Sequence, residues 1–433
     1  MAASNTRQPH GLSRRDFARM VTVGGAASWF VGGQPWTRPV EALPQTPAMP
    51  DEAFWSAVRD QFVMPRDLGV LNAANLCPSS APVLDALFEN TRDMDRDPSP
   101  QNRVKMGEGK ETTRQIIADF LRVTPEEILI TRNTSEASNM VSSGVHLGEG
   151  DEIVLFADNH PSNKRAWESK SERYGFTIKE LPNPNPHPGP EYYIKAVTDA
   201  ITPRTRVVAV THLTSTVGDL MPAKEICRIA REREVLTLLD GAQTFGLLDV
   251  DLSDIQPDFY SGSAHKWPCG AKEAGVLFVN QRSQDKIWPT ILSAYSGRVG
   301  ISRTHEGFGQ RDEPAIIAFG EALKLQTKVG RQAIEKRSQQ LAQLVIKELG
   351  RVDGVTVWTS PDPSRSSAVV SFLPGNLDLR KLSAALYEND RIACATRGGQ
   401  DRGGLRFSPH FYNLQSEVER GIAAVKKYMA QGV

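Results

Sequence analysis

The segment from Val235 to Val279 constrains the fold of this chain more than any other. It opens with a short apolar run, residues 235–239, that has charged residues on both sides. Such a run is typical of a buried strand in a parallel sheet. Asp240 follows at the carboxyl end of the predicted strand, where open α/β sheets place their ligands. Lys266 comes later in the same segment, directly after a run of small and polar residues.

A buried acid at a strand end and a lysine preceded by small hydroxyl residues together suit a site for pyridoxal 5′-phosphate (PLP). The lysine amine forms a Schiff base with PLP, and the acid keeps the pyridine nitrogen protonated. Each residue alone has an ordinary explanation, since most lysines are solvated surface charges and most aspartates at strand ends cap helices. The combination is what predicts the PLP site.

Three stretches of this segment, Asp-Gly-Ala-Gln (240–243), Ser-Gly-Ser-Ala-His-Lys (261–266) and Ala-Gly-Val-Leu-Phe-Val (274–279), resemble the class V aminotransferase family. That family includes cysteine desulfurases, selenocysteine lyases and isopenicillin N epimerases, all PLP enzymes of fold type I. The resemblance extends over nearly all of residues 69–430. It implies an α/β fold, the PLP-dependent transferase fold type I, with a mostly parallel central sheet in a large domain and a small α+β domain at the C-terminus.

The rest of the chain agrees with this fold. Apolar runs at 128–131, 152–156 and 206–210 alternate with helical segments, which favours a parallel sheet. Helices are expected at 110–121, 223–233, 315–327, 331–349, 379–388 and 416–429, and further strands at 355–358, 368–372 and 391–396. The expected division is a signal peptide at 1–42, an N-terminal arm at 43–75, a large PLP-binding domain at 76–314 and a small domain at 315–433.

A phosphate site is predicted where the strand at 128–131 turns into a helix. Thr134 and Ser135 stand at the helix start, where free N–H groups and hydroxyls form an anion site. The simpler alternative is an ordinary helix cap. The resemblance implies that Ser263 and His265 join these two residues around the phosphate.

The resemblance also implies the other roles in the site. His160 stacks on the cofactor ring, Asp240 pairs with the pyridine nitrogen, and Gln243 donates to the phenolic oxygen. Either Thr214 or Ser215 contacts that oxygen as well, and Ser215 is our choice for the site. Lys266 binds PLP and then acts as a base at the substrate Cα, so Lys266, His160 and Asp240 form the predicted catalytic set.

Arg406 is the predicted ligand of the substrate carboxylate. A guanidinium grips a carboxylate with two parallel hydrogen bonds, and the apolar neighbours of Arg406 make a solvated surface position a poor explanation. The motif Leu-Arg-Phe-Ser (405–408) before Tyr-Asn also matches the Arg-x-Ser of the family.

Two features depart from the family pattern. Cysteine desulfurases have a nucleophilic cysteine on a loop shortly before the arginine, and residues 397–404 contain none. Cys394 lies earlier, in the predicted strand at 391–396, where a cysteine is an inert apolar residue. Gln310 replaces the threonine that in relatives reaches the phosphate of a neighbouring subunit. Persulfide chemistry is therefore disfavoured. A hydrogen bond from Gln310 to the phosphate of a neighbouring subunit, and with it a homodimer, remain expectations.

The N-terminus predicts export. Ser-Arg-Arg-Asp-Phe-Ala-Arg (13–19) precedes an apolar run at 20–33 and a small-residue cleavage site at 40–42, as in a twin-arginine signal. The alternative is a basic tail. The signal predicts a periplasmic or otherwise exported enzyme that uses the twin-arginine machinery. A net charge of zero gives no reason to expect a nucleic-acid partner. Four scattered cysteines with no CxxC pair predict no disulfide framework, and no metal site is expected.

The leading hypothesis is a PLP enzyme that acts through an aldimine on the amino group of an amino acid or peptide, like isopenicillin N epimerase. Some exported relatives modify peptide siderophores such as pyoverdine, so periplasmic tailoring of a siderophore is one alternative. A cysteine desulfurase or selenocysteine lyase is another. A binding protein that kept the fold without PLP is a third, from a different class. Epimerisation, transamination, elimination and decarboxylation stay open as reactions.

Overall fold

A seven-stranded sheet organises the larger part of the chain. The computed structural model describes residues 42–398 and 402–433. The strand order is β2-β8-β7-β6-β5-β3-β4, and all neighbours are parallel except that β8 runs antiparallel to β2 and β7. The strands are β2 (Ile128–Thr131), β3 (Glu152–Phe156), β4 (Thr177–Leu181), β5 (Thr205–Thr211), β6 (Leu236–Asp240), β7 (Phe259–Ser263) and β8 (Gly275–Val279). The mostly parallel sheet of the predicted fold is confirmed.

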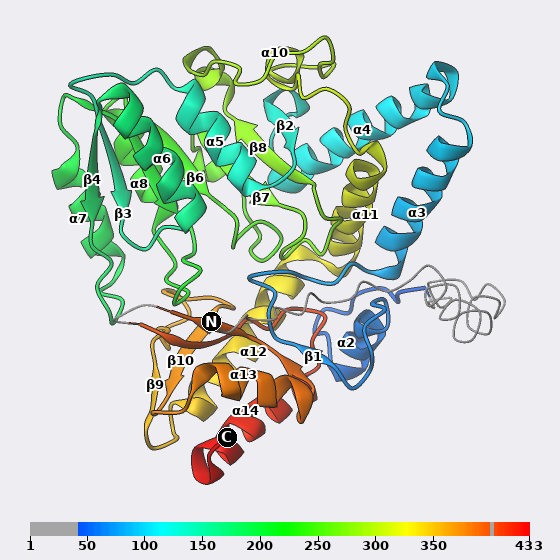
Figure 1. Cartoon of the computed structure of the whole chain (residues 1–433), viewed down its shortest axis with the longest axis vertical. Helices are drawn as coiled ribbons and strands as arrows, with labels where there is room; N and C mark the ends of the chain where they lie inside the picture. Colours follow the sequence, from blue (N-terminus) through cyan, green and yellow to red (C-terminus); the bar gives the residue numbers. More distant parts are fainter. Residues whose placement is uncertain (1–41, 399–401) are drawn as a thin grey trace, which may run out of the picture. The chain divides into compact units, whose positions relative to one another are not determined.

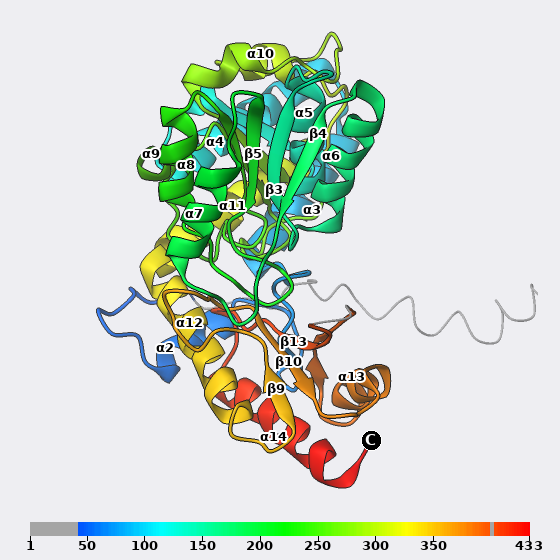
Figure 2. The ribbon, with the colours of Figure 1, turned by 90° about the vertical axis from the view of Figure 1, so that its left-hand side faces the viewer.

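Alternate residues of each strand enter two different cores, one on each face of the sheet. In β2, Ile128 and Ile130 pack into the core under α4, α7, α8 and α11, whereas Leu129 packs into the core under α5 and α6. This separation follows from the two-residue period of a strand. Figure 2 shows α5 and α6 on one side of the sheet and α7 and α8 on the other. The helices are α4 (Pro100–Leu121), α5 (Thr134–Gly144), α6 (Pro161–Tyr174), α7 (Pro190–Ala200), α8 (Ala223–Glu232) and α11 (Glu313–Val329).

A smaller antiparallel sheet forms from the C-terminal part, with the order β12-β13-β10-β9. Figure 1 shows it beside α12, α13 and α14, at the opposite end from α10 (Ser302–His305). Its strands are β9 (Val355–Val357), β10 (Val370–Pro374), β12 (Ala395–Arg397) and β13 (Gly404–Phe407). Its helices are α12 (Arg331–Leu349), α13 (Leu379–Glu388) and α14 (Gln415–Gln431).

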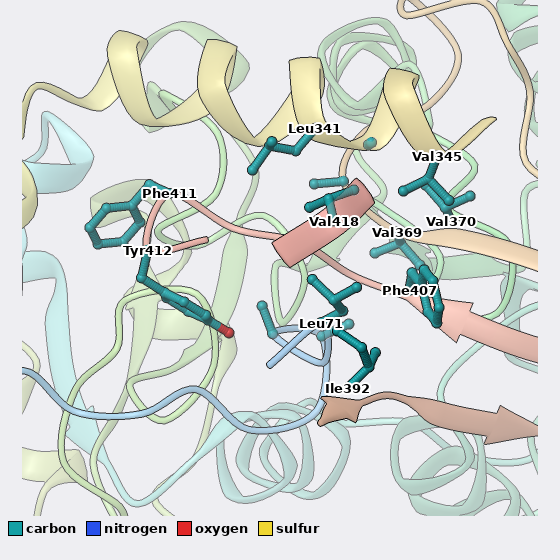
Figure 3. Close-up of a cluster of buried hydrophobic side chains, with 14 of the residues drawn as sticks. Leu71, Leu341, Val345, Val369, Val370, Ile392, Phe407, Phe411, Tyr412 and Val418 are labelled. Carbon is teal, nitrogen blue, oxygen red and sulfur yellow. The ribbon is translucent and has the colours of Figure 1, made fainter. Parts of the chain in front are cut away.

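The N-terminal arm packs into this C-terminal part. Its helix α2 (Glu52–Arg59) contributes Trp55 to the C-terminal core, and β1 (Gly69–Val70) pairs in parallel with β11 (Ile392–Ala393). Leu71 lies close to Ile392 and Phe407 in the same core (Figure 3). The arm therefore brings residues 71–77 from the start of the chain to the edge of the part that holds the seven-stranded sheet. The predicted domain boundaries at 75 and 314 remain predictions.

Several predicted elements match the structure closely, two differ from it, and one edge strand was not predicted. The helix α4 begins at Pro100, well before the predicted residue 110, because Ser99 caps it by accepting the Asn102 N–H and a proline occupies its first position. The predicted strand at 391–396 is two short strands, β11 and β12, each paired with a different partner. The edge strand β4 had no prediction, since it lacks a clear buried face. Within the described part of the chain, no helix is long and apolar enough to cross a bilayer.

Candidate active site

A cavity of about 280 Å³ lies at the carboxyl ends of the central strands. Nine of the eleven predicted site residues line it. They are Thr134, Ser135, His160, Ser215, Asp240, Gln243, Ser263, His265 and Lys266. Residues that the sequence analysis did not select line it too, namely Ala74, Asn75, Asn133, Ser138, Ser162, Asn163, Ala242 and Arg397. The arm, five strand ends and the C-terminal part thus meet at one place.

Asp240 is held rigidly at the end of β6. Its side chain is 2% exposed, and Oδ1 accepts the Ala242 N–H at 3.0 Å. Gly241 is needed at the next position because an added Cβ would lie within about 2.3 Å of the Tyr260 ring and hydroxyl. The other carboxylate oxygen of Asp240 has no hydrogen-bond partner within the described residues. A buried carboxylate with a free oxygen that faces a cavity suits a protonated ring nitrogen.

Lys266 is half-buried and lines the same cavity, three residues after the end of β7. Burial lowers the pKa of its amine, and the positive charge of Arg397 lowers it further, while Asp240 partly opposes both effects. A lower pKa leaves more of the amine uncharged near neutral pH. An uncharged amine is the form that attacks an aldehyde or removes a proton.

The other end of the cavity is built for an anion. Asn133 caps α5 by accepting the Glu136 N–H at 3.0 Å, so the positive end of the helix dipole points into the cavity. The Thr134 N–H donates to Ser263 Oγ at 2.9 Å, which joins the helix start to the end of β7. Ser138 lines the cavity from the next turn of the helix, and its buried hydroxyl has no partner among the described residues. These groups fit a phosphate.

His160 caps α6 with its ring. Its Nδ1 accepts the Ser162 N–H at 3.2 Å, so the proton of the neutral ring sits on Nε2. Burial and the positive charge of Lys266 lower the pKa of His160, which keeps the ring neutral. Burial, with the charges of Lys266 and Lys272, lowers the pKa of His265 to about 4. Both imidazole rings are therefore uncharged in the site at neutral pH.

Gln243 presents an N–H to the cavity because its carbonyl is occupied. The Trp267 indole donates to Gln243 Oε1 at 2.8 Å, and Gln243 Nε2 donates to the Ala74 carbonyl at 3.0 Å. One of the two amide hydrogens then remains for a ligand oxygen. The sequence analysis did not identify Trp267 as the residue that orients this amide.

Two arginines lie near the cavity and differ in what they contact, and the role of Arg406 as ligand of the substrate carboxylate remains a prediction. Arg406 is fully buried and does not line the cavity; it donates to the Ser215 carbonyl at 2.9 Å and to Asn72 Oδ1 at 3.3 Å. Arg397, at the end of β12, lines the cavity, and its buried Nε has no partner among the described residues. Arg406 thus supports the cavity wall, and Arg397 is the guanidinium that faces the interior. In the sequence, the signal that could have singled out Arg397 was its position at the start of a Gly-rich stretch.

The remaining predicted residues are also placed. Ser215 lines the cavity, whereas the Thr214 hydroxyl accepts the Asp219 N–H at 3.0 Å. Gln310 lies in a separate surface depression, where Arg103 donates to its side-chain oxygen at 2.8 Å. Its predicted contact with a neighbouring subunit remains a prediction. Cys394 lies between β11 and β12, outside the cavity, and burial raises the pKa of its thiol to about 11.

Comparison with known proteins places the chain in a family. The family model described as "Aminotransferase class-V" matches residues 80–420. The chain belongs to the class-V aminotransferase family. It is similar to an isopenicillin N epimerase of Amycolatopsis lactamdurans, with 31% identity over 391 residues that cover 86% of this chain and 98% of that protein. It is also similar to a probable cysteine desulfurase of Methanothermobacter thermautotrophicus, with 26% identity over 389 residues, 84% of this chain and 95% of that one.

The fold also matches solved structures. The lyase C-DES, solved with glycine covalently linked to its PLP cofactor, has a TM-score of 0.77 and 23% identity, covering 87% of this chain and 99% of that one. This class-V aminotransferase has fold type I and is a PLP-dependent enzyme.

The residues of the cavity fit PLP at both ends. Lys266 would hold its aldehyde carbon, Asp240 its ring nitrogen, and the start of α5 its phosphate. PLP supplies an electron sink that weakens the bonds at the substrate Cα. With PLP bound, the Asp240 carboxylate would lie beside the ring nitrogen, burial would keep His160 neutral, and the Lys266 amine would be available to take and return a proton at Cα.

Proposed function

We propose that this class-V aminotransferase acts at the Cα of an amino acid or peptide with a free α-carboxylate, as an isopenicillin N epimerase does. The observation that carries this proposal is the meeting of Lys266, Asp240 and Arg397 around one cavity. Arg397 binds the carboxylate and the Lys266 amine exchanges the Cα proton. The 31% identity with the Amycolatopsis epimerase supports the epimerase class over the probable desulfurases, which match at 26–29%.

The reaction is tested by incubating the purified enzyme with a panel of L-amino acids and short peptides in deuterated water. Exchange of the Cα hydrogen together with formation of the D-isomer supports an epimerase, and both are measured by mass spectrometry and chiral chromatography. The panel includes peptides of the siderophore class, because a tailored peptide is the alternative substrate. Formation of a keto acid or sulfide without any D-isomer contradicts the epimerase proposal.

A cysteine desulfurase is the second candidate, and Cys394→Ala separates it from the epimerase. We expect turnover of the variant to stay within a few fold of wild type, because Cys394 lies outside the cavity and burial raises its thiol pKa to about 11. Sulfide release from cysteine is measured in parallel with turnover. Loss of sulfide release in Cys394→Ala, with wild-type protein active on cysteine, would move the protein to the desulfurases.

Arg397→Met tests the carboxylate contact. A charge-assisted hydrogen bond is worth ~1.5–3 kcal/mol, so we expect KM to rise roughly tenfold to a hundredfold. Arg406→Met is the matched comparison: its guanidinium holds the Ser215 carbonyl and Asn72, and we expect a lower melting temperature from the loss of these buried bonds. An unchanged KM in Arg397→Met would show that another group binds the carboxylate.

We further propose that the enzyme is exported through the twin-arginine machinery and functions as a homodimer. The paired arginines at 14–15 support export, although residues 1–41 lie outside the described part of the chain. Fractionation of cells that express wild type and an Arg14→Lys, Arg15→Lys variant tests the location, and retention of the wild type in the cytoplasm contradicts it. Light scattering of the purified protein tests the dimer.

A further inference from the structure

Three charged residues form a buried cluster beside the cavity wall. Asp158 lies in the turn between β3 and α6, Asp219 in the loop between β5 and α8, and Arg402 shortly before β13. Arg402 Nη1 lies 3.6 Å from Asp158 Oδ2 and 3.9 Å from Asp219 Oδ2. Asp219 is fully buried and Asp158 is 9% exposed. In the part of the chain that the structure describes, Arg402 is the cation that pairs with both carboxylates.

Both loops also carry residues of the cavity. Asp158 lies two residues before His160. Its Oδ1 accepts a hydrogen bond from the Thr216 hydroxyl. Thr216 follows Ser215, and the Asp219 N–H donates to the Thr214 hydroxyl on the other side of Ser215. The backbone that presents His160 is thus tied to the backbone that presents Ser215.

Charge attraction, more than hydrogen bonding, holds the cluster together. Both carboxylate oxygens of Asp219, Asp158 Oδ2 and Arg402 Nη1 have no hydrogen-bond partner among the described residues. Two carboxylates in a buried space repel each other unless a cation or a proton compensates. Arg402 supplies this compensation from the residues that lead into β13.

We propose that Asp158, Asp219 and Arg402 are positioning residues of the PLP site, whose ion cluster fixes the loops that present His160 and Ser215 to the cofactor. None of the three lines the cavity, so they act through their neighbours. The proposal rests on PLP binding in this cavity. It adds the residues that hold the loops of His160 and Ser215 in place.

The charge of the cluster depends on pH through Asp219. Burial and the negative charge of Asp158 together raise the pKa of Asp219 to about 7, while Arg402 partly opposes both. The Tyr193 phenol on α7 faces the same cluster. Because the pKa of Asp219 is above its value in an unfolded chain, the contribution of Asp219 to stability is full at low pH and is lost as pH rises toward 7. Above that pH, Asp219 competes with Asp158 for Arg402.

The test is PLP binding to cofactor-free full-length protein, followed by absorbance between pH 6 and 9, with melting temperature in parallel. We expect Arg402→Met to weaken PLP binding roughly tenfold, the middle of the range for coupled neighbouring residues. Arg402→Lys should keep most of the affinity, because it retains the charge. Adding Asp219→Asn to Arg402→Met should recover part of the loss, because one carboxylate then lacks its repulsive neighbour. Asp219→Asn alone should flatten the change of affinity around pH 7.

Arg122→Met is the matched control, because Arg122 also lies between two carboxylates, Asp249 and Asp251, and does not line the cavity. It should leave PLP affinity and absorbance unchanged. A lower melting temperature in Arg402→Met with wild-type PLP affinity and an unchanged pH profile would show a purely structural role and overturn the proposal. Wild-type protein that binds no PLP would instead overturn the cofactor assignment, and the positioning role with it.

Discussion

Lys266→Ala should abolish covalent binding of PLP and reduce turnover on the order of 10²- to 10⁴-fold, the usual contribution of a general base. The purified wild-type protein should be yellow, and borohydride should fix the mass of PLP on Lys266. The variant should show neither property, because no other amine lines the cavity in the described part of the chain. Absorbance spectra and peptide mass spectrometry measure both results.

Lys272→Ala is the control for this experiment. Lys272 also lies close to His265, but its amine donates to Ser79 Oγ at 3.2 Å and does not line the cavity. We expect it to keep the yellow colour and most of the turnover. A borohydride adduct on Lys272, or a colourless wild-type protein that takes up no added PLP, would contradict the assignment of Lys266.

Asp240→Asn should keep the fold and lose turnover by roughly a hundredfold to several thousandfold. Removal of one partner of a buried ion pair costs ~3–5 kcal/mol, and each 1.36 kcal/mol of barrier is a factor of ten. Asparagine keeps the size of the side chain but holds no negative charge beside the ring nitrogen, so PLP withdraws electrons less well. Turnover and PLP affinity are measured together, and the loss should fall mainly on turnover.

Asp258→Asn separates the chemistry of Asp240 from the general cost of altering a buried acid. Asp258 is 5% exposed, accepts the Thr237 N–H at 2.8 Å, and lies before β7, at the opposite end of the sheet from the cavity. We expect this variant to melt at a lower temperature and to keep the PLP absorbance and turnover. Near-normal turnover in Asp240→Asn would show that Asp240 is not the partner of the ring nitrogen.

The sequence by itself determined the family, the parallel sheet and most of the residues that face the cavity. Asp240 and Lys266 were recognisable because a buried strand, an acid at its end and a lysine after small hydroxyl residues occur in one continuous segment. Thr134 and His160 were recognisable for a related reason, since each follows an apolar run and begins a helix. A local pattern predicts the end of a strand, and a parallel sheet brings such ends to the same edge.

The tertiary structure decided which of two arginines faces the cavity. Arg397 and Arg406 lie on adjacent antiparallel strands, β12 and β13, and are both near cavity residues. Arg406 donates to the Ser215 carbonyl and to Asn72 and does not line the cavity, whereas Arg397 lines it. A motif gives the residue type but not the direction of the side chain, which depends on packing between distant segments.

The cluster of Asp158, Asp219 and Arg402 is still less predictable from the sequence. Each residue alone reads as an ordinary loop charge, and the segments that carry them are far apart along the chain. Only the fold brings Arg402 within 4 Å of both carboxylates and shields the cluster from water, and burial is the main cause that raises the pKa of Asp219 to about 7. Electrostatic coupling depends on distance and solvent exposure, and neither quantity can be read from spacing in the sequence.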